Sequence, residues 1–280
     1  LSEDELGETL TQLILQRRER RRNIDPQRLV AVIGCRGGAG GSTIAAMTAQ
    51  ALVDVYAKKT LLMDFDLDFG AQFVTFNVEP TVGFADMFAN PQRVDALFLD
   101  RTMAAASKGL SVLSVARFGE DIKVVPDAPQ HIVTQALQGI DRVVLDIPAR
   151  SKIPPDIALQ AGSLILVTTP TLHGLRDALQ VFSWLEGKGY ENKPLVVINR
   201  LREFRHGVVR EAEFRKRMEC DIVEIGYDPR SAAQLFLENK TLLQARGQLR
   251  KDVEPVIRHL AGPQGEAPPP KSFLARLLEK

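Results

Sequence analysis

The sequence is poor in cysteine, with only Cys35 and Cys220 among its 280 residues. Two cysteines are too few for a disulfide framework, and the spacing of this pair matches no zinc-binding pattern. So low a cysteine content fits a protein of a reducing compartment, and we therefore expect the chain to act in the cytoplasm.

An excess of charge and a long apolar run are missing as well. The formal net charge is +1, so the field of the whole molecule attracts nucleic acid only weakly, and no nucleic-acid partner is expected. No apolar run approaches the roughly 18 residues of a membrane-spanning helix, and no signal peptide is visible. The composition, 45% hydrophobic and 25% charged residues, is typical of a globular protein.

The histidines follow no catalytic or metal-binding pattern. No Ser/His/Asp order is present, and no pair of histidines has the spacing of metal ligands. We expect each histidine to lie at the surface rather than to bind a ligand; the four are His131, His173, His206 and His259.

Composition divides the chain into three parts. Residues 1–24 are expected to form a linker helix that remains after an upstream domain, because Ser2 and Glu5 are spaced as a capping box and Leu1 is not a methionine. Residues 25–261 are expected to form one α/β domain. Residues 262–280 combine a proline-rich linker with a short amphipathic helix.

Each end segment leaves two interpretations open. The basic second half of the first helix fits either a solvated linker or a contact with acidic lipid or an acidic partner. The amphipathic stretch 271–280 is too short to be stable alone in water. It would therefore be either a frayed tail or a segment that docks on a membrane surface or in a protein groove.

Between these ends, short apolar runs rich in β-branched residues alternate with helical stretches. Such runs are typical of strands buried on both faces of a parallel sheet. The alternation predicts an α/β fold with a doubly wound, mostly parallel sheet flanked by helices. The expected strands are 29–33, 60–63, 110–115, 142–145, 164–167 and 194–198, and the expected helices include 42–56, 175–184 and 208–218.

A glycine-rich turn joins the first strand to the next helix, which is the sequence context of a phosphate-binding P-loop. Its glycines let backbone N–H groups converge on phosphate oxygens, and the helix N-terminus adds partial positive charge. Ser42 stands where a hydroxyl ligand of Mg²⁺ belongs. The alternative is an ordinary glycine-rich turn. The residues expected at the nucleotide are Arg36, Gly37, Gly38, Ala39, Gly40, Gly41, Ser42 and Thr43.

The loop departs twice from the pattern G-x-x-x-x-G-K-[ST], because Cys35 replaces the first glycine and Gly41 replaces the lysine. A charged hydrogen bond contributes about 1.5–3 kcal/mol, so the missing lysine would weaken nucleotide binding by roughly 10–100-fold. It would slow hydrolysis by a further factor on the order of 10²–10³. Cys35 lies near a helix N-terminus, which can lower a thiol pKa, but a buried, inert thiol is favoured.

Carboxylates follow two of the expected strands. Asp64 and Asp66 end the second strand, and two positions apart in an extended chain their side chains share one side. Both can face a cluster of Mg²⁺ and phosphate. Asp146 ends a later strand and is suited to hold a metal-bound water. One such aspartate often caps a helix, but two behind a P-loop favour a metal site.

Residues 36–43 resemble the deviant Walker A box of the MinD/ParA superfamily, whose usual form is Lys-Gly-Gly-x-Gly-Lys-Ser/Thr. Over about residues 28–260 the chain is similar, more closely, to the TadZ/CpaE family of type IV (Tad/Flp) pilus assembly proteins. The order of matching segments and the missing second lysine carry this resemblance; the segments are 61–70, 83–88, 146–148, 166–170 with 175–178, 197–200 and 225–229.

The resemblance implies a role for each matching residue. Asp66 would be the switch I aspartate that positions water, with Asp64 as its metal-side neighbour. Asp146 would be the Walker B aspartate, so Asp66 and Asp146 are the candidate catalytic residues. Together with Ser42 they are also the candidate ligands of Mg²⁺, and the implied cofactors are ATP or ADP with Mg²⁺.

The same resemblance implies where the base binds. Asn199 and Arg200 would lie at the adenine, and Tyr227 and Asp228, from the last matching segment, are counted with them as nucleotide-binding residues. In the superfamily the first lysine reaches across a nucleotide-sandwich dimer. Arg36 stands at that position and keeps the charge with a different geometry, so a homodimer is expected while an ATP-driven monomer–dimer cycle is in doubt.

Three hypotheses about function follow. The favoured one is a nucleotide-binding scaffold with little or no turnover that organises pilus or secretion machinery, peripherally at the inner membrane or at a cell pole, as the resemblance implies. The second is an active ATPase that cycles on a membrane or nucleoid. The third is a pseudo-ATPase without nucleotide, and the retained Ser42, Asp66 and Asp146 argue against it.

Overall fold

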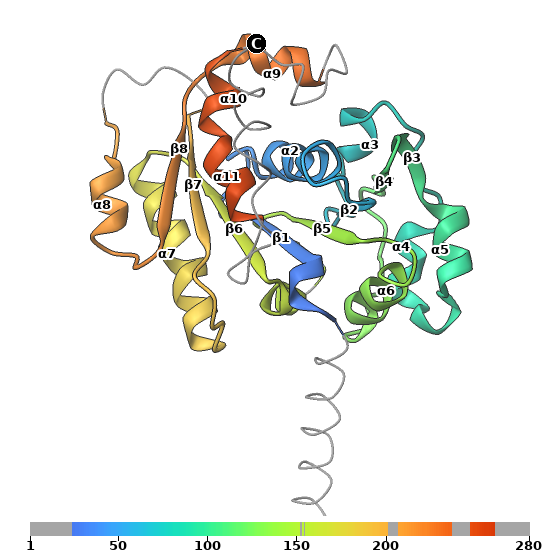
Figure 1. The fold of residues 1–280 in the computed structure, drawn as a ribbon. Helices are drawn as coiled ribbons and strands as arrows, with labels where there is room; N and C mark the ends of the chain where they lie inside the picture. Colours follow the sequence, from blue (N-terminus) through green and yellow to red (C-terminus); the bar gives the residue numbers. More distant parts are fainter. Residues whose placement is uncertain (1–23, 152, 154, 201–206, 237–246, 261–280) are drawn as a thin grey trace, which may run out of the picture.

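The central strands of the sheet are apolar runs that are buried on both sides, as their composition predicts. The fold was obtained as a computed structural model, which describes residues 24–151, 153, 155–200, 207–236 and 247–260 (Figure 1). The expected helices at the two ends of the chain lie outside the described residues and stay predictions. Nowhere in the described ranges does a helix have both the length and the apolar character needed to cross a membrane.

An eight-stranded sheet in the order β3-β4-β2-β5-β1-β6-β7-β8 forms the centre of the molecule. Only the β3–β4 pair is antiparallel, so the predicted mostly parallel, doubly wound sheet is confirmed. The strands are β1 (Leu29–Gly34), β2 (Thr60–Asp64), β3 (Ala104–Ser107), β4 (Leu110–Leu113), β5 (Arg142–Ile147), β6 (Ser163–Thr168), β7 (Leu195–Asn199) and β8 (Asp221–Ile225).

Helices cover both faces of this sheet (Figure 1). Side chains alternate between the faces along β1, so that Ala31 packs into one hydrophobic core with α4 to α8 and Val32 into another with α2 and α9 to α11. The helices are α2 (Gly41–Asp54), α3 (Gln72–Thr75), α4 (Phe84–Ala89), α5 (Ala96–Thr102), α6 (Ala128–Ala136), α7 (Leu172–Gly187), α8 (Glu211–Arg215), α9 (Pro229–Phe236), α10 (Gln248–Asp252) and α11 (Glu254–His259), with 3₁₀ turns at η1 (Pro26–Arg28), η2 (Pro91–Arg93) and η3 (Pro155–Gln160).

The central strand β1 lies between β5 and β6; the strands β2 to β5 lie on one side of it, and the chain then crosses from β5 to β6 on the other side. Ligands of open α/β sheets bind at such a switch point, outside the carboxyl ends of the strands. The loop after β1 and the ends of β2 and β5 therefore meet in one place, where the sequence places its glycines and carboxylates.

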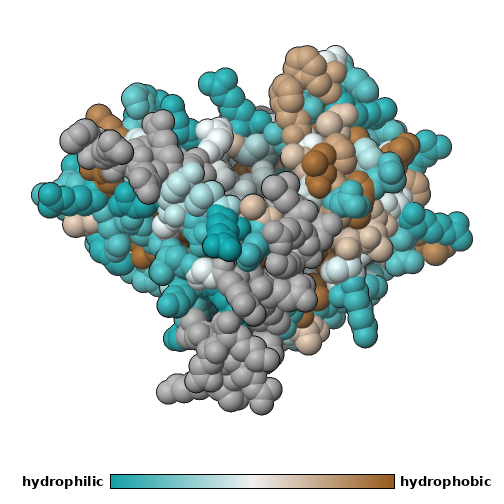
Figure 2. Space-filling view, turned by 90° about the horizontal axis from the view of Figure 1, so that it is seen from above, coloured by the Kyte–Doolittle hydropathy of each residue, from teal (hydrophilic) through white to brown (hydrophobic). Residues whose placement is uncertain are grey.

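The structure also contains elements that hydrophobic periodicity does not reveal. The edge strand β3 is built from alanines, and the opposite edge strand β8 carries Asp221 and Glu224, so neither is a continuous apolar run. Hydrophobic side chains gather on the side of the molecule that carries α3 and β3 (Figure 2), where Val74 is 67% exposed. His131 and His259, expected at the surface, are half-buried instead, because each lies on a helix that packs against the sheet.

Candidate nucleotide site

The glycine-rich loop between β1 and α2 has the backbone of a phosphate cradle. Gly38 and Gly40 have positive φ angles of 73° and 88°, which side chains rarely allow. Gly40 is the N-cap of α2, and as a glycine it has no side chain that could accept a hydrogen bond from the first turn. The N–H groups of this turn are therefore available to an anion, and the helix dipole adds to their attraction.

The lysine position of the loop is tightly packed. A Cβ atom on Gly41 would lie 3.0 Å from the Cα of Gly34 and 3.3 Å from its nitrogen. A side chain at position 41 therefore needs the end of β1 to move by a few tenths of an ångström. At Gly41, where the lysine is missing, the loop thus lies close to Gly34 at the end of β1.

The aspartates at the ends of β2 and β5 lie side by side. Asp64 and Asp146 are register partners in the parallel pair of strands, and both are 2% exposed. Asp64 Oδ2 accepts hydrogen bonds from the hydroxyl of Ser114 at 2.8 Å and from the backbone N–H of Ala71 at 2.9 Å. Two neighbouring carboxylates in the interior are costly unless a cation or protons balance them.

Burial, followed by the charge of Asp64, raises the pKa of Asp146 from 3.8 to about 7. Burial likewise raises the pKa of Asp64, while its hydrogen bonds lower it and only partly compensate. The amide of Gln72 and the hydroxyl of Ser42 stabilise the charged form of Asp146. This strand end is therefore short of positive charge, which is the condition for binding a divalent cation.

A metal ion would need more than these side chains. Within the described ranges, no group of three or more His, Cys, Asp and Glu residues is placed to hold one. Mg²⁺ is usually held by one or two protein oxygens, several waters and substrate phosphates. The exposed hydroxyl of Ser42 and the carboxylate of Asp146 fit that partial set, so a nucleotide would supply the remaining ligands.

Asp66 lies apart from the buried pair. The strand ends at Asp64, so Asp66 is in the following loop, where its Oδ1 accepts a hydrogen bond from the N–H of Phe69 at 2.9 Å. Its charge contributes to the raised pKa of Asp146, which places it within electrostatic range of the site. The structure thus brings together Ser42, Asp64 and Asp146 and leaves Asp66 at the rim.

A cavity of about 310 Å³ opens beside the first turn of α2 and is lined by the residues that are expected to bind the adenine base. Asn199 donates its amide to the carbonyl oxygen of Ala39 at 3.0 Å and so joins β7 to the loop. Arg200 pairs with Glu224, Tyr227 is 46% exposed, and Asp228 accepts hydrogen bonds from the N–H and hydroxyl of Ser231. Asp228 therefore holds the cavity wall together through its carboxylate.

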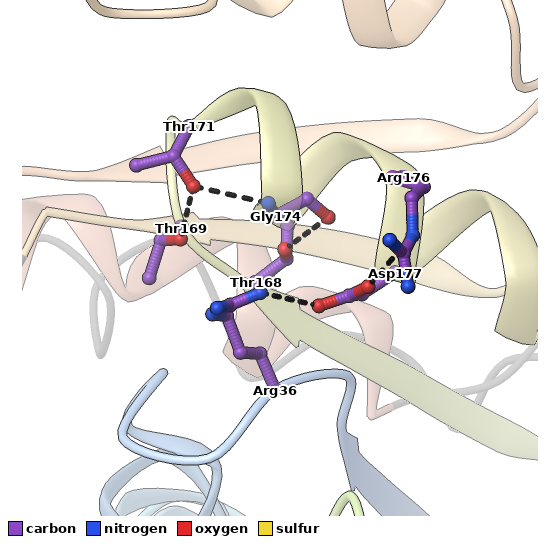
Figure 3. Close-up of polar contacts among 7 residues, drawn as sticks. All are labelled: Arg36, Thr168, Thr169, Thr171, Gly174, Arg176 and Asp177. Carbon is purple, nitrogen blue, oxygen red and sulfur yellow. Dashed lines mark hydrogen bonds and ion pairs between the residues drawn. The ribbon is translucent and has the colours of Figure 1, made fainter.

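Arg36 is held within its own chain (Figure 3). Its Nη1 lies 2.7 Å from Oδ2 of Asp177 on α7, and the Nε of Arg176 lies 3.4 Å from the other oxygen of the same carboxylate. The Arg36 side chain is 43% exposed. The only charge that the loop retains thus points to the side of α7, in a pairing that solvent screens.

The start of α7 is fixed by threonines and a glycine (Figure 3). Thr171 caps the helix by accepting from the N–H of Gly174 at 3.0 Å, and Thr168 donates its hydroxyl to the carbonyl of Gly174 at 2.7 Å. A Cβ atom on Gly174 would lie 2.2 Å from the carbonyl oxygen of Thr169. The close approach of helix and strand sets the position of Asp177 one turn later.

We expect Gly174→Ala to lower the free energy of unfolding by about 1–3 kcal/mol, because the added methyl group overlaps the backbone of Thr169. Denaturant titration measures this change. Gly187→Ala, at the other end of α7, is the matched control, since a Cβ atom there meets nothing within 4 Å. Equal stability of the two variants would contradict the steric argument.

A second, larger cavity of about 980 Å³ lies next to Arg36 and is lined by charges of both signs, among them Asp66, Arg150 and Arg176. Two solvent-exposed aromatic rings lie beside this cavity. Phe69, which lines the cavity, and Phe118 are 66% and 75% exposed, with ring centroids 4.9 Å apart. Exposed aromatic pairs of this kind are typical of contact surfaces.

The favoured interpretation of Cys35 as an inert thiol agrees with its surroundings. Cys35 is 8% exposed, and burial together with the charge of Asp177 raises the pKa of its thiol to about 12. A thiol with so high a pKa is protonated at neutral pH and is a poor nucleophile. The burial and the raised thiol pKa thus favour a packing role for Cys35.

Fold and site together define the class of P-loop nucleoside triphosphatase domains, with a phosphate loop after β1 and carboxylates at the ends of β2 and β5. No family model matches the chain. The septum site-determining protein MinD of Synechocystis is 27% identical over 184 residues, which cover 62% of this chain and 65% of that protein. The chain thus spans slightly less than two thirds of this curated relative.

Solved structures agree with that relationship. A ParA family ATPase from Chlorobium tepidum has a TM-score of 0.70 at 25% identity, covering 83% of this chain and 98% of its own. MinD from Pyrococcus horikoshii, determined with Mg-ADP, shares the fold with a TM-score of 0.65 at 20% identity, over 84% of this chain and 94% of its own. The chain is homologous to the ATPases of the MinD/ParA superfamily.

Some residues of the site escape inspection of the sequence. Gln72, Ser114 and Asp177 contact the predicted site residues, although they lie 8 to 141 positions away from the partners they bond. Gln72 and Ser114 lie in none of the motifs named above, and Asp177, although it falls in the matching segment 175–178, has no role assigned by it. Only the meeting of distant chain segments gives them a role.

Proposed function

We propose that the chain binds Mg-ATP or Mg-ADP with slow turnover and acts as a dimeric scaffold in type IV (Tad/Flp) pilus assembly. The observation that carries the proposal is the composition of the site. Ser42, Asp64 and Asp146 supply oxygen atoms that would hold Mg²⁺ beside the phosphate loop, while position 41 carries no cation.

Retention of nucleotide is supported by the phosphate loop. Its glycine backbone and the uncapped start of α2 supply neutral N–H donors and a partial positive charge. Bound Mg²⁺ would add the charge that phosphate oxygens need. The Mg-ADP complex of the homologous MinD from P. horikoshii adds weight to this choice of cofactor.

Slow turnover follows from the absence of a charged donor at position 41. Hydrolysis builds charge on the transferred phosphoryl group, and fixed cations aimed at it contribute most of the catalysis. Within the loop only Arg36 is cationic, and Asp177 holds it away to the side of α7. Binding, which uses the backbone donors, is less affected than the chemical step.

A homodimer is supported by the surface beside Arg36. This surface presents the aromatic pair Phe69 and Phe118 next to a cavity with charges of both signs, so two copies related by a twofold axis can be complementary. In such a dimer Arg36 is the residue nearest to the partner's phosphates, as the superfamily resemblance implies.

The role in pilus assembly rests on the resemblance to the TadZ/CpaE family. The matching segments follow one another in the same order, from β2 to the cavity at Tyr227. A scaffold that holds its nucleotide provides a stable docking surface for other assembly proteins. The test is whether the purified chain binds the assembly ATPase of a Tad/Flp system in the presence of Mg-ATP; failure to bind it with or without nucleotide would refute this part of the proposal.

Calorimetric titration with Mg-ATP, combined with a turnover assay, tests the nucleotide-holding role. We expect clear binding heat and turnover roughly 10²–10³-fold below that of P-loop ATPases with an intact lysine. Ordinary turnover would instead favour the active, cycling ATPase. Absence of heat in the wild type would refute nucleotide binding altogether.

Arg36→Ala is expected to weaken nucleotide-dependent dimerisation by about 10-fold or more, because it removes a charged contact with phosphate. Arg176→Ala is the matched control, since Arg176 contacts the same carboxylate and lines the same cavity. Sedimentation velocity with and without Mg-ATP measures the monomer–dimer distribution. Equal loss in both variants would assign the effect to the surface charge rather than to Arg36.

A further inference from the structure

Gln72 connects three parts of the site, although no motif contains it. It is fully buried at the start of α3, and its backbone N–H donates to Asp64 Oδ2 at 3.2 Å. Its side-chain nitrogen Nε2 donates to Asp146 Oδ2 at 2.7 Å and to the backbone carbonyl of Ser42 at 2.9 Å. One residue therefore ties both strand-end aspartates to the phosphate loop.

The preceding turn explains why Gln72 reaches this place. A Cβ atom on Gly70 would lie 2.3 Å from the carbonyl oxygen of Val115 and 2.7 Å from that of Asp66, so only glycine fits. The chain turns sharply there, and the N–H groups of Ala71 and Gln72 then meet the Asp64 carboxylate. The position of the Gln72 side chain is thus fixed by its own backbone.

The orientation of the amide group is also fixed. Both atoms that Nε2 contacts are acceptors, so the nitrogen must face them and the oxygen must face the other way. Gln72 Oε1 is buried and has no hydrogen-bond partner among the residues that the structure describes. A buried acceptor without a donor is costly, and most such atoms in proteins are paired with protein or water.

We propose that Gln72 is a positioning residue of the magnesium site, an inference that rests on the proposed binding of Mg-nucleotide. Its nitrogen holds Asp146 and the Ser42 backbone at a set separation. Ligands of a metal are commonly oriented by such partners, whose loss lowers metal affinity about 10–100-fold.

The test compares ATP binding in EDTA with ATP binding in Mg²⁺, by calorimetry on the full chain. Gln72→Met keeps the length of the side chain and removes all its hydrogen bonds. In this variant we expect the Mg²⁺ ratio, which is the ATP affinity in Mg²⁺ divided by the ATP affinity in EDTA, to fall about 10-fold or more. Affinity in EDTA stays within about 3-fold of the wild type, because the phosphate loop is intact.

Gln50→Met is the matched control. Gln50 lies on α2 outside the site, and its side-chain oxygen is likewise buried with no partner in the described part of the chain. Gln50→Met also replaces a buried amide oxygen by an apolar group, and we expect it to leave the Mg²⁺ dependence of ATP binding unchanged. If Gln72 had only a structural role, both variants would melt at a lower temperature than the wild type, and neither would change the Mg²⁺ ratio.

A measurement on the wild type keeps the proposal testable if Gln72→Met does not fold. Nitrogen-15 NMR follows the side-chain amide of Gln72, and we expect its signals to shift when Mg²⁺ is added to the ATP-bound protein, whereas those of Gln50 stay in place. An unchanged Gln72 signal, or an unchanged Mg²⁺ ratio in Gln72→Met, overturns the role of Gln72 alone. Absence of ATP binding in the wild type overturns the proposed function with it.

Discussion

Gly41→Lys is expected to raise the rate of ATP hydrolysis by roughly 10²–10³-fold, because it returns a fixed cation to the place where charge develops in the transition state. Nucleotide binding should tighten by up to roughly 100-fold, the value of one strong charged hydrogen bond. A single-turnover assay separates the two effects, since it reports the chemical step apart from binding.

Part of this gain is offset by strain. The Cβ atom of the new lysine would lie 3.0 Å from the Cα of Gly34, so β1 must shift slightly at its end. Overpacking of this kind typically costs about 1–3 kcal/mol of stability. We therefore expect the variant to melt at a lower temperature than the wild type while it hydrolyses ATP faster.

Two control variants separate charge from position and size. Gly37→Lys adds the same charge at a point of the loop where a Cβ atom meets nothing within 4 Å. Gly41→Met adds similar bulk without charge. If either control accelerates hydrolysis as much as Gly41→Lys does, the missing lysine is not what limits turnover.

Asp146→Asn is expected to abolish the effect of Mg²⁺ on nucleotide binding, with a loss of about 10–100-fold in affinity in the presence of the metal. An amide is close to the carboxylate in shape and keeps an acceptor for Gln72, so the fold is retained. Calorimetry in Mg²⁺ and in EDTA measures the change. If Asp146→Asn kept the full Mg²⁺ dependence of nucleotide binding, Asp146 would not be part of the metal site.

The same substitution should stabilise the protein without ligand. The pKa of Asp146 is raised from 3.8 to about 7 by burial and by the charge of Asp64, so between these pH values the folded state binds more protons than the unfolded state. Stability of the wild type then falls as pH rises through this window. We expect Asp146→Asn to reduce that fall and to add on the order of 1–3 kcal/mol above pH 7.

Denaturant titrations at several pH values between about 4 and 8 test this expectation. Asp156→Asn is the control, because Asp156 is a partly exposed carboxylate that pairs only with Lys188 among the described residues. It should leave the pH dependence unchanged. A loss of stability in Asp146→Asn at high pH would show that the aspartate pair is charge-compensated even without a metal.

The class of fold follows from the sequence because the signals that define it are local. Strands buried on both faces are continuous apolar runs, and the expected strands, β1 and β5 among them, agree with the observed bounds to within two residues. The phosphate loop is equally local, since its glycines and Ser42 are consecutive. The absence of the lysine is likewise read directly from the sequence, and the slow turnover that we expect from it stays a prediction.

The edges of the sheet and the polar contacts of the site could not be predicted in this way. The strands β3 and β8 have no apolar run of their own, and pairing with their neighbours makes them strands. Asp64 and Asp66 illustrate the limit within one motif. Spacing predicts that both face the metal, whereas the chain leaves the strand after Asp64 and holds Asp66 at the rim through the N–H of Phe69.

The sequence by itself therefore determined the inventory of the candidate site: consecutive glycines, a hydroxyl and carboxylates at strand ends, and no lysine at position 41. Only the tertiary structure decided which groups act together. It joined Asp146 to Gln72 across 74 positions and Arg36 to Asp177 across 141. The physical reason is that backbone and apolar periodicity are properties of neighbours in the chain, whereas charge balance in a buried site depends on whichever segments the sheet brings together.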